Sequence, residues 1–529
     1  MIPRPINCDA YSLNSFRYES PEALEYSSYA LAFRRKLSDI NPDLFTEGDN
    51  RIIFYGISNI IREIFTSPIT HQEIDETKRF LEDRKYSSQT CRAFEFPEYL
   101  WREIVDKYQG RIPICINGLK EGSICYPGES VLRVTNTVPG FGTLAAWCES
   151  LLLHVWATSE LATNCRHWLE NQLLLTNAIE SGDICFKDGK VIKVNGSLPH
   201  NKDISLLIAQ SRLHNFGARA AICSTESERL GAAHLLSFNG TDTFSGAYHA
   251  WQLGAPNQIG SSIDVAAHRT IASWIPYHES YKVMYDIAQD GDLISEVGDL
   301  VDYKRDLREY LIPLALDAAK RQNGKIIVAR PDSGDPIDMV IYTLKEMEKA
   351  GLFTIGPNGF KYPTNMRIIQ SDSMDWATIT RIDLIVLNMG WACTSVIVYG
   401  MGGHLRNSIK RDNLSAKYYL ESVGKEASPR VKFSDTSGKR SLPAHTVCRD
   451  EEALKTGITI LSRLENREDA LVNYYNGLSD QPFGPGTNDD FMTIRNRVLN
   501  EFNKMPLAAG KLSEHFSKEY SSLKALYGK

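Results

Sequence analysis

The chain has 529 residues, of which 43% are hydrophobic and 23% charged, and its formal net charge is −6 at pH 7. This composition is that of a globular protein with a sizeable core, and it has no basic excess that would attract nucleic acid or an acidic membrane. The ten cysteines are scattered with no CxxC pair, so we expect reduced, mostly buried thiols and no zinc site.

The N-terminal run MIPRPINCDAYSLNSFRYES has no apolar core long enough for a signal peptide. The most apolar stretch, residues 382–398, contains Asp383 and Asn388 and runs into glycines. It is typical of a buried strand and the segment after it, not of a membrane span. We therefore expect a cytoplasmic protein with no membrane partner and no nucleic-acid partner.

Helical and β-rich segments follow one another in the first part of the chain. Residues 51–67 carry apolar side chains at helical spacing. Residues 112–135 alternate short β-rich runs with glycine and proline–glycine turns, which predicts an antiparallel β module. Residues 142–176 predict long, largely buried helices.

From about residue 205 the pattern changes to short apolar runs that each end in a polar, glycine-containing turn. Helical patterns lie between several of these runs. Such βα alternation predicts a parallel sheet or barrel with functional groups at the carboxyl ends of the strands. The end of the chain is polar and irregular, with helices predicted near 449–464 and 490–503.

The strongest motif is KIIVARPDSGDP, at residues 325–336. An apolar strand there delivers Arg330, Asp332 and Ser333 to one turn, where Gly334 lets the backbone approach a ligand. An arginine suits phosphate oxygens, and the carboxylate beside it suits ribose hydroxyls or a magnesium ion. A salt-bridged turn without a ligand is the alternative, because short motifs often mislead.

A glycine-rich strand-to-helix turn lies at residues 398–412, VYGMGGHLRNSIKRD. Such turns expose backbone N–H groups that bind phosphate. The turn contains Gly402, Gly403 and His404, and Arg411 adds positive charge nearby. A tight turn without a ligand explains the glycines equally well.

Two motifs place polar side chains beside apolar runs. In residues 368–375, IIQSDSMD, Ser371 and Asp372 follow a predicted strand, and a solvated turn is the alternative. In residues 264–274, DVAAHRTIASW, His268 precedes an apolar, helix-like run. A lone histidine is more often a hydrogen-bonded structural residue than a catalytic one.

Two shorter motifs complete the set. In residues 213–219, LHNFGAR, Phe216 either belongs to the core or stacks on a flat heterocycle, and Arg219 lies three positions later. In residues 239–243, NGTDT, the alternative to a site is an ordinary turn capped by Asp242.

In this order and at these spacings, the six motifs and the N-terminal run Cys8-Asp9-Ala10-Tyr11 resemble the nicotinamide phosphoribosyltransferase family. The wider relatives are the nicotinate and quinolinate type II phosphoribosyltransferases. The likeness extends from about Asp9 to Arg440 and includes the non-catalytic run EGSICYPGESVLRVTNTVP. Several co-linear motifs over hundreds of residues are far more specific than any one of them.

The resemblance implies a mixed α/β fold, with an irregular α/β barrel and an interleaved second domain. It also implies a homodimer with active sites at the subunit interface. We accordingly assign residues 1–27 and 205–408 to the barrel, as the catalytic domain. Residues 28–204 and 409–529 form the second domain, with the β module, helices and C-terminal segment.

The resemblance gives roles around the nicotinamide base. Phe216 and Tyr11 of the partner subunit would sandwich the pyridine ring, and Asp242 would accept a hydrogen bond from the carboxamide. His268 matches the histidine that family enzymes phosphorylate when ATP hydrolysis is coupled to synthesis.

A second set of residues would hold the donor. The resemblance assigns pyrophosphate to Arg219, Arg330 and Arg411 of the partner subunit, and magnesium pyrophosphate to Asp299 and Asp332. Asp332 would also bind the ribose hydroxyls, with Ser333 beside it. The 5′-phosphate subsite would be formed by Gly402, Gly403 and Ser371, next to Asp372 and His404. Either Arg34 or Arg35 matches a further phosphate-binding arginine.

The implied chemistry fits these groups. Departure of pyrophosphate leaves an oxocarbenium-like centre at C1, so arginines and magnesium must neutralise the charge of the leaving group. The pyridine nitrogen is already nucleophilic and needs positioning more than a base. We therefore assign catalytic roles to His268, Asp299, Arg330 and Asp332 without proposing a general base.

Three departures from the family pattern bear on ATP and on the donor. Ala267 replaces an acidic residue before the histidine, so we expect ATP to stimulate the reaction weakly or not at all. Ser371 and Ser373, and also His404, replace glycines around the 5′-phosphate subsite. The donor is therefore either phosphoribosyl pyrophosphate, the family default, or ADP-ribose pyrophosphate, which a viral branch uses to make NAD directly.

The main prediction is a pentosyltransferase that joins nicotinamide to such a donor and makes nicotinamide mononucleotide (NMN). A nicotinate phosphoribosyltransferase is one alternative, but Asp242 would repel the anionic nicotinate. An inactive nucleotide-binding dimer is another, and it is opposed by the joint presence of five charged residues: Arg219, Asp242, Arg330, Asp332 and Arg411.

Overall fold

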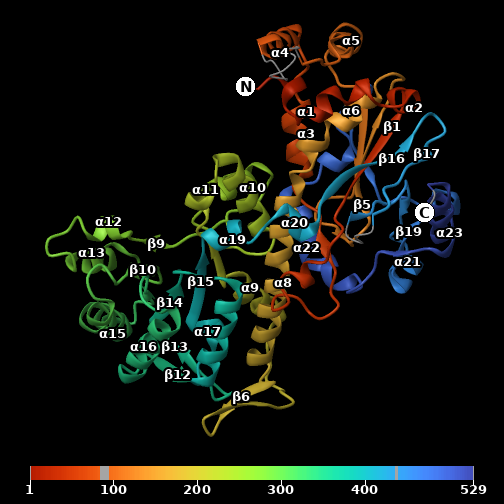
Figure 1. Cartoon of the computed structure of the whole chain (residues 1–529). Coiled ribbons are helices and arrows are strands. Elements are labelled where there is room, and N and C mark those ends of the chain that lie inside the picture. Colours follow the sequence, from red (N-terminus) through yellow and green to blue (C-terminus); the bar gives the residue numbers. More distant parts are fainter. Residues whose placement is uncertain (1, 84–93, 435–438, 528–529) are drawn as a thin grey trace. The chain divides into compact units, whose positions relative to one another are not determined.

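The computed structural model describes residues 2–83, 94–434 and 439–527 (Figure 1). The chain forms two compact units, of which the first comprises residues 1–163 and 409–529 and the second residues 164–408. The predicted division differs at two segments. Residues 1–27 belong to the first unit, and residues 164–204 to the second.

The first unit is built on a six-stranded antiparallel sheet. Its strands, in spatial order, are β17 (Ser428–Pro429), β16 (Lys417–Val423), β1 (Ser27–Ala32), β5 (Ser130–Asn136), β3 (Ile114–Gly118) and β20 (Val472–Asn476). The pair β3–β5 confirms the β module predicted for residues 112–135. Every side chain of β5 except Thr135 is buried, so this strand lies in the core of the unit.

The predicted helices of the first part of the chain are present, and the last of them continues from the first unit into the second. The helix predicted at 51–67 is α3 (Ile57–Phe65), which begins after the left-handed Gly56. The apolar stretch 142–176 forms α6 (Gly142–Trp147), α7 (Glu149–Leu152) and most of α8 (Val155–Glu180), which confirms the predicted helices.

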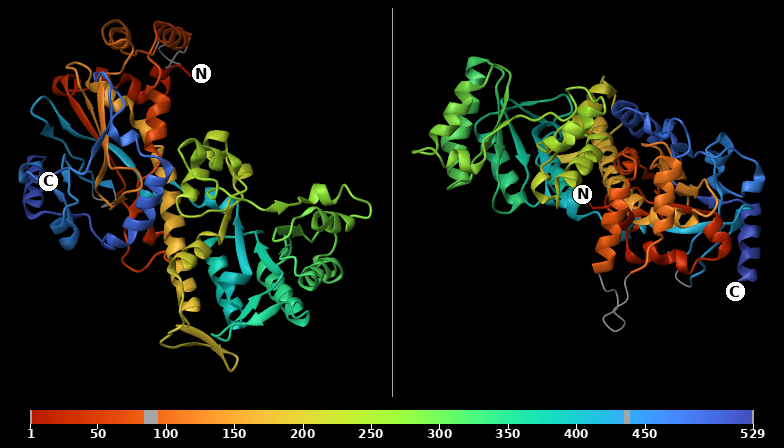
Figure 2. Two further views of the ribbon diagram at one scale, coloured as in Figure 1. Left: turned by 180° about the vertical axis from the view of Figure 1, so that it is seen from behind. Right: turned by 90° about the horizontal axis from the view of Figure 1, so that it is seen from above.

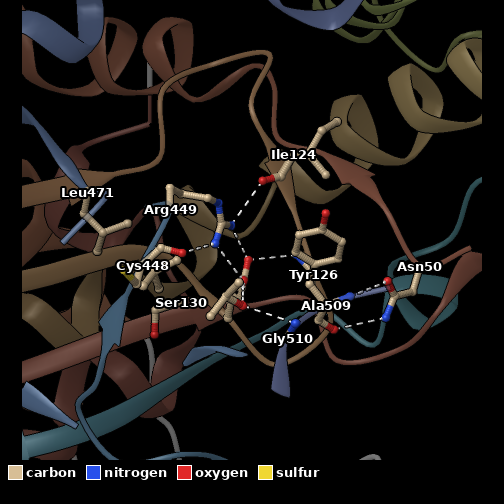
Figure 3. A network of polar contacts seen from close by, with 12 residues as sticks. Asn50, Ile124, Tyr126, Ser130, Cys448, Arg449, Leu471, Ala509 and Gly510 are labelled. Carbon is tan, nitrogen blue, oxygen red and sulfur yellow. Dashed lines mark hydrogen bonds and ion pairs between the residues drawn. The ribbon is translucent and has the colours of Figure 1, made fainter. Parts of the chain in front are cut away.

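Within the first unit, Arg449 of the C-terminal segment donates hydrogen bonds to the carbonyls of Ile124 and Cys448 (Figure 3). Glu129 accepts hydrogen bonds from the Arg449 guanidinium, at 2.9 Å for Nη1, and from the Thr459 hydroxyl. The helix predicted near 449–464 is wrong beyond Thr456. Residues Ile458–Leu461 form strand β19 because three of the four residues of ITIL are β-branched and the segment pairs with two strands, β18 (Thr446–Val447) and β21 (Lys511–Leu512).

The second unit is built on a curled sheet of six parallel strands, as half of a barrel (Figure 2). The spatial order is β8 (Leu213–Asn215), β15 (Ile397–Met401), β14 (Met366–Gln370), β11 (Ile326–Arg330), β10 (Leu293–Val297) and β9 (Asp264–Val265). Parallel pairing throughout confirms the predicted βα alternation. All six carboxyl ends therefore meet at one edge.

Helices cover the outer face of the curled sheet, among them α15 (Ile312–Arg321), α16 (Pro336–Lys349) and α17 (Trp376–Asn388). On α17, the buried Asp383 accepts hydrogen bonds from Arg212 at 2.6 Å and from the Tyr399 hydroxyl at 2.7 Å. The strand expected at the start of 382–398 is wrong, since this helix runs to Asn388 and β15 begins at Ile397. Among the described residues, no helix combines the length and apolarity needed to cross a membrane.

Candidate active site

The carboxyl ends of the parallel strands enclose a pocket of about 460 Å³ in the second unit, which we call the strand-end pocket. The residues that line it include Phe216, Arg219, Asp242, His268, Arg330 and Asp332. These six residues come from four of the sequence motifs, whose segments reach the same edge of the sheet. The predicted meeting of these motifs is therefore a property of the fold.

Phe216 forms one wall of the pocket. Its backbone N–H donates to the Met401 carbonyl at 2.9 Å, which extends the pairing of β8 with β15. A Cβ atom at Gly400 would lie 2.2 Å from the Phe216 ring, so only glycine leaves space for the ring there. The Arg330 guanidinium lies 5.1 Å from the ring centroid, as a cation–π pair.

Asp242 lies at another wall with its side chain exposed. Its backbone N–H donates to the Asn215 carbonyl at 3.0 Å, while the Asn215 side chain accepts from the Gly217 N–H at 2.7 Å. Asn215, which the sequence analysis did not single out, thus fixes both turns that carry Phe216 and Asp242. The Asp242 carboxylate accepts a hydrogen bond from Ser262.

His268 contacts two carboxylates that follow neighbouring strands. Its Nε2 lies 2.7 Å from Asp299 Oδ1, and its Nδ1 lies 3.9 Å from Asp332 Oδ2. Asp299 is almost completely buried, with 6% of its side chain exposed, whereas His268 is 41% exposed. This cluster brings His268 together with Asp299 and Asp332, which lie 31 and 64 positions after it in the sequence.

The two aspartates fit a magnesium ion that arrives with its phosphate ligand. Magnesium is usually bound by one or two carboxylates, water and substrate phosphates. Among the described residues, no group of three or more histidine, cysteine, aspartate or glutamate side chains is arranged to hold a metal alone. Asp299 and Asp332 would therefore supply protein ligands to a magnesium–pyrophosphate complex.

Ser371 joins the arginine–carboxylate pair of the strand-end pocket. Arg330 Nε donates to Ser371 Oγ at 3.1 Å, and this hydroxyl donates to Asp332 Oδ1 at 3.2 Å. Arg330 Nη2 lies 3.5 Å from the same carboxylate oxygen. The Ser371 hydroxyl is thus directed to Arg330 and Asp332, while the resemblance assigns it to a 5′-phosphate cradle.

The other predicted phosphate-loop residues lie outside the lining of the strand-end pocket. Gly402 precedes the short helix α19 (Gly403–Asn407), and the His404 ring meets the Trp376 ring edge-on at 6.1 Å between centroids. Burial lowers the pKa of His404. Its Nε2 is buried without a hydrogen-bond partner among the described residues.

Ser333 and Asp372 also lie outside that lining. Ser333 is exposed and Asp372 half-buried. Ser373 adopts φ 54°, a left-handed conformation that favours glycine. The backbone at this turn has therefore kept a glycine-like conformation.

The remaining predicted residues, Tyr11 and Arg411, lie in the first unit. Arg411 lines a pocket of about 300 Å³, which we call the basic pocket. Its lining consists of Arg34, Arg411, Lys417, Tyr419, Lys432, Lys439 and Ser441, without a carboxylate among the described residues. Of the two arginines between which the resemblance leaves a choice, Arg34 lines this pocket and Arg35 is not among its lining residues.

Tyr11 is linked to the basic pocket through a carboxylate. Lys417 Nζ lies 3.0 Å from Glu149 Oε1, and Glu149 also interacts with the Tyr11 hydroxyl. Burial, then the charge of Glu149, raise the pKa of Tyr11 to about 12. The sequence analysis missed Lys417, Lys432 and Lys439, which no local motif distinguishes from surface lysines.

Comparison with known proteins identifies the family. Residues 211–456 match the model of the nicotinate phosphoribosyltransferase (NAPRTase) family. The chain is 30% identical over 362 residues to a nicotinamide phosphoribosyltransferase of Xanthomonas campestris, covering 68% of this chain and 70% of the relative. The chain belongs to the type II phosphoribosyltransferase family. It is therefore a transferase of NAD biosynthesis, as the motifs predict.

A second relative and two solved structures match over most of the chain. A nicotinamide phosphoribosyltransferase of Acinetobacter baylyi is 23% identical over 501 residues, covering 88% of this chain and 91% of the relative. The human nicotinic acid phosphoribosyltransferase structure matches with a TM-score of 0.54 at 13% identity, covering 98% and 100% of the two chains. The nicotinate-nucleotide pyrophosphorylase of Pyrococcus furiosus matches with a TM-score of 0.53 at 13% identity, covering 95% and 96%. Both structures confirm the fold class.

Within this phosphoribosyltransferase, the two pockets differ in what they can do chemically. The strand-end pocket presents an aromatic wall, a carboxylate, and an arginine–aspartate–histidine cluster. It can therefore orient a flat base and neutralise a phosphate leaving group. The basic pocket presents cations and hydroxyls and suits an anion alone.

Proposed function

We propose that the protein transfers the ribosyl group of a ribosyl-1-pyrophosphate donor to nicotinamide, forming NMN and releasing pyrophosphate. One observation carries this proposal. Asp242 and Phe216, which suit a carboxamide on a flat ring, line the same pocket as Arg330, Asp332 and His268, which suit magnesium pyrophosphate. Both substrates can therefore meet in this pocket.

The residues present account for the displacement at C1. Phe216 would hold the pyridine ring with its nitrogen toward C1, and nucleophilic attack then needs positioning and no base. Arg330, fixed by Ser371 and Asp332, would neutralise charge as the bond from C1 to pyrophosphate breaks. Magnesium, when bound with pyrophosphate to Asp299 and Asp332, supplies further positive charge to the leaving group.

Asp242 favours nicotinamide over nicotinate. Its exposed carboxylate can accept a hydrogen bond from the carboxamide N–H, whereas it would repel the carboxylate of nicotinate. The relatives from Xanthomonas campestris and Acinetobacter baylyi, both named nicotinamide phosphoribosyltransferase, support the same base. Nicotinate serves as the competing substrate in the test.

We infer that the functional form is a homodimer in which the basic pocket of one subunit completes the strand-end pocket of the other. Tyr11 and Arg411 support this inference, because the family resemblance assigns both to the partner subunit. The basic pocket is lined by arginines and lysines and, among the described residues, by no carboxylate, which suits the binding of pyrophosphate. We keep the cytoplasm as the expected compartment, since the nine described cysteines are all free thiols.

One observation supports ADP-ribose pyrophosphate as a second candidate for the donor substrate. His404 replaces a glycine and presents a buried Nε2 without a partner among the described residues, which leaves a hydrogen-bonding group for a longer donor. ADP-ribose pyrophosphate would then give NAD directly. Phosphoribosyl pyrophosphate remains the main proposal, because the Ser371 hydroxyl is directed to Arg330 and Asp332 and is not free to read a longer donor.

The deciding experiment supplies nicotinamide or nicotinate with each donor in turn and identifies the product by mass. NMN from nicotinamide and phosphoribosyl pyrophosphate is the expected product, with little product from nicotinate. NAD as the predominant product would replace the proposed donor with ADP-ribose pyrophosphate. His404→Gly should then shift the preference toward the shorter donor. Release of pyrophosphate without a pyridine nucleotide would contradict the proposal for both donors.

A further inference from the structure

The strand-end pocket contains three guanidinium groups, and only one of them is held by protein groups. Arg330 contacts Ser371 and Asp332. Arg219 and Arg269 also line the pocket and are exposed. Within residues 2–83, 94–434 and 439–527, neither has a hydrogen bond or ion pair with another side chain or backbone group. Two unpaired cations in one pocket indicate an anionic ligand.

Arg219 already has a role through the family resemblance, whereas Arg269 has none. Arg269 belongs to the short helix α12 (His268–Ile271), directly after the extended Ala267. The backbone is fixed on both sides by buried apolar residues, because Ala266 is 4% exposed and Ile271 is fully buried. The position of Arg269 is therefore set by the fold, while its side chain stays free for a ligand.

The chain neighbour of Arg269 belongs to the group of residues that suits pyrophosphate. This neighbour is His268, whose imidazole contacts Asp299 and approaches Asp332, the two carboxylates that fit magnesium pyrophosphate. The base end is marked by Asp242, which interacts with Ser262 and Asn215 on other turns. Arg269 thus lines the same pocket as these carboxylates, directly after His268 in the chain.

Arginine is well suited to this place. A departing pyrophosphate gains negative charge as its bond to C1 breaks, and Arg330 is the one guanidinium of this pocket fixed by described protein groups. A guanidinium presents a planar fork of N–H donors that matches two phosphate oxygens at once. Because the carboxylates Asp299 and Asp332 would repel pyrophosphate without its metal, an additional cation beside them has a clear electrostatic purpose.

We propose that Arg269 is a further binding residue for the pyrophosphate group of the donor and for the released pyrophosphate. This proposal rests on the proposed function, since it concerns the same pocket. It adds a residue from the segment after β9 to those contributed by the ends of β8 and β11.

The test compares Arg269→Ala and Arg269→Lys with a matched control, Arg381→Ala. Arg381 is an exposed arginine of the same unit that does not line the strand-end pocket. Titration calorimetry on the full chain measures affinity for magnesium pyrophosphate and, separately, for nicotinamide. Initial rates give the KM of the donor and the inhibition constant of pyrophosphate.

We expect Arg269→Ala to weaken pyrophosphate binding by about tenfold or more, with a similar rise in donor KM, because a hydrogen-bonded charge is lost. Arg269→Lys should recover part of this affinity as a point charge. Nicotinamide affinity, and all properties of Arg381→Ala, should stay within about twofold of the wild type.

Two results would overturn the proposal. One is unchanged pyrophosphate affinity in Arg269→Ala. The other is an equal loss of nicotinamide affinity, which would place Arg269 at the base. Failure of the proposed function looks different. In that case the wild type makes no pyridine nucleotide, while the calorimetric loss of pyrophosphate binding in Arg269→Ala still reports on Arg269.

Discussion

The strand-end pocket and the basic pocket are assembled by different kinds of pairing. The strand-end pocket collects residues from successive strand ends of one parallel sheet, within residues 216–332. The basic pocket joins residues 34 and 441, whose approach depends on antiparallel pairing of β1 with β16, where Ala32 faces Lys417. The first carries both signs of charge and can orient a base, whereas the second carries cations and can neutralise an anion.

From this difference in charge we expect the reaction to take place in the strand-end pocket, with electrostatic assistance from the basic pocket. A pocket with an aromatic wall, carboxylates and arginines can distinguish substrates. A pocket lined by Arg34, Arg411 and lysines adds electrostatic attraction without selecting the base. Variants in the two pockets should therefore fail in different ways.

The largest effect is expected from Arg330→Ala. This change removes the cation that is fixed by Ser371 and Asp332, and it leaves Asp332 without its arginine. Loss of one preorganised donor to a leaving group lowers kcat by about 10²–10³-fold. Steady-state kinetics with nicotinamide and donor measure the loss, with Arg381→Ala as control. A loss of kcat below tenfold would show that Arg330 does not stabilise the transition state.

A pH-dependent effect is expected beside the basic pocket. Glu160 of α8 accepts hydrogen bonds from the Lys410 N–H at 3.0 Å and from Asn413 Nδ2 at 2.7 Å, on the turn that carries Arg411. Burial raises the pKa of Glu160 from its ordinary value of 4.5 to about 7. Lys410 is the charged group beside it and acts in the opposite direction.

Because the folded protein binds this proton more tightly than the unfolded chain, Glu160 lowers stability as pH rises from about 4.5 to about 7. The contribution is at most about 3 kcal/mol, at 1.36 kcal/mol for each pKa unit. Glu160→Gln should remove this part of the pH dependence, as measured by urea unfolding at pH 5 and pH 8. Equal slopes in variant and wild type would show that Glu160 does not titrate in this range.

Base selection should depend on the strand-end pocket alone. Asp242→Asn replaces the carboxylate that would accept the carboxamide N–H, and such a hydrogen bond contributes about 1.5–3 kcal/mol. The kcat/KM for nicotinamide should fall accordingly, and the bias against nicotinate should lessen. Asp290→Asn, at an exposed aspartate outside the pocket, is the matched control. Unchanged nicotinamide kinetics in Asp242→Asn would exclude this residue from the site.

The smallest effect is expected from ATP. His268 Nε2 is held by Asp299, and Ala267 offers no carboxylate to help place a nucleotide or orient the imidazole. ATP should therefore raise the product yield by well under tenfold. A tenfold gain would correspond to a coupling free energy of about 1.4 kcal/mol. Product yield with and without ATP, in wild type and His268→Ala, measures this. A large gain that is lost in His268→Ala would show that Ala267 does not limit the coupling.

The comparison also shows how far the sequence predicts the molecule. Arg330 and Asp332 were predictable because an apolar run followed by a glycine turn has one local solution, a strand that delivers them to its carboxyl end. The lysines of the basic pocket were not predictable, because only the register of β1 against β16 brings Lys417 near Arg34. Sequence spacing carries no signal for such a long-range pairing.

Side-chain direction was also beyond the sequence. Ser371 was correctly placed after a strand, but its bonds to Arg330 and Asp332 depend on the neighbouring β11. The contact of His268 with Asp299 likewise requires β9 and β10 to pair in parallel. Local motifs therefore predict which residues reach the pocket, whereas the pairing of the strands determines which of their side chains contact one another.

The central claim is that the strand-end pocket of one subunit works with the basic pocket of its partner, and subunit complementation tests it most directly. Tyr11→Ala and Arg330→Ala subunits, each nearly inactive alone, are mixed under conditions that exchange subunits, and heterodimers are isolated with two different tags. One of the two sites in each heterodimer then has both residues intact, so about half of the wild-type activity should return. Heterodimers that stay as inactive as their parents would contradict the account and show that each site is built from a single chain.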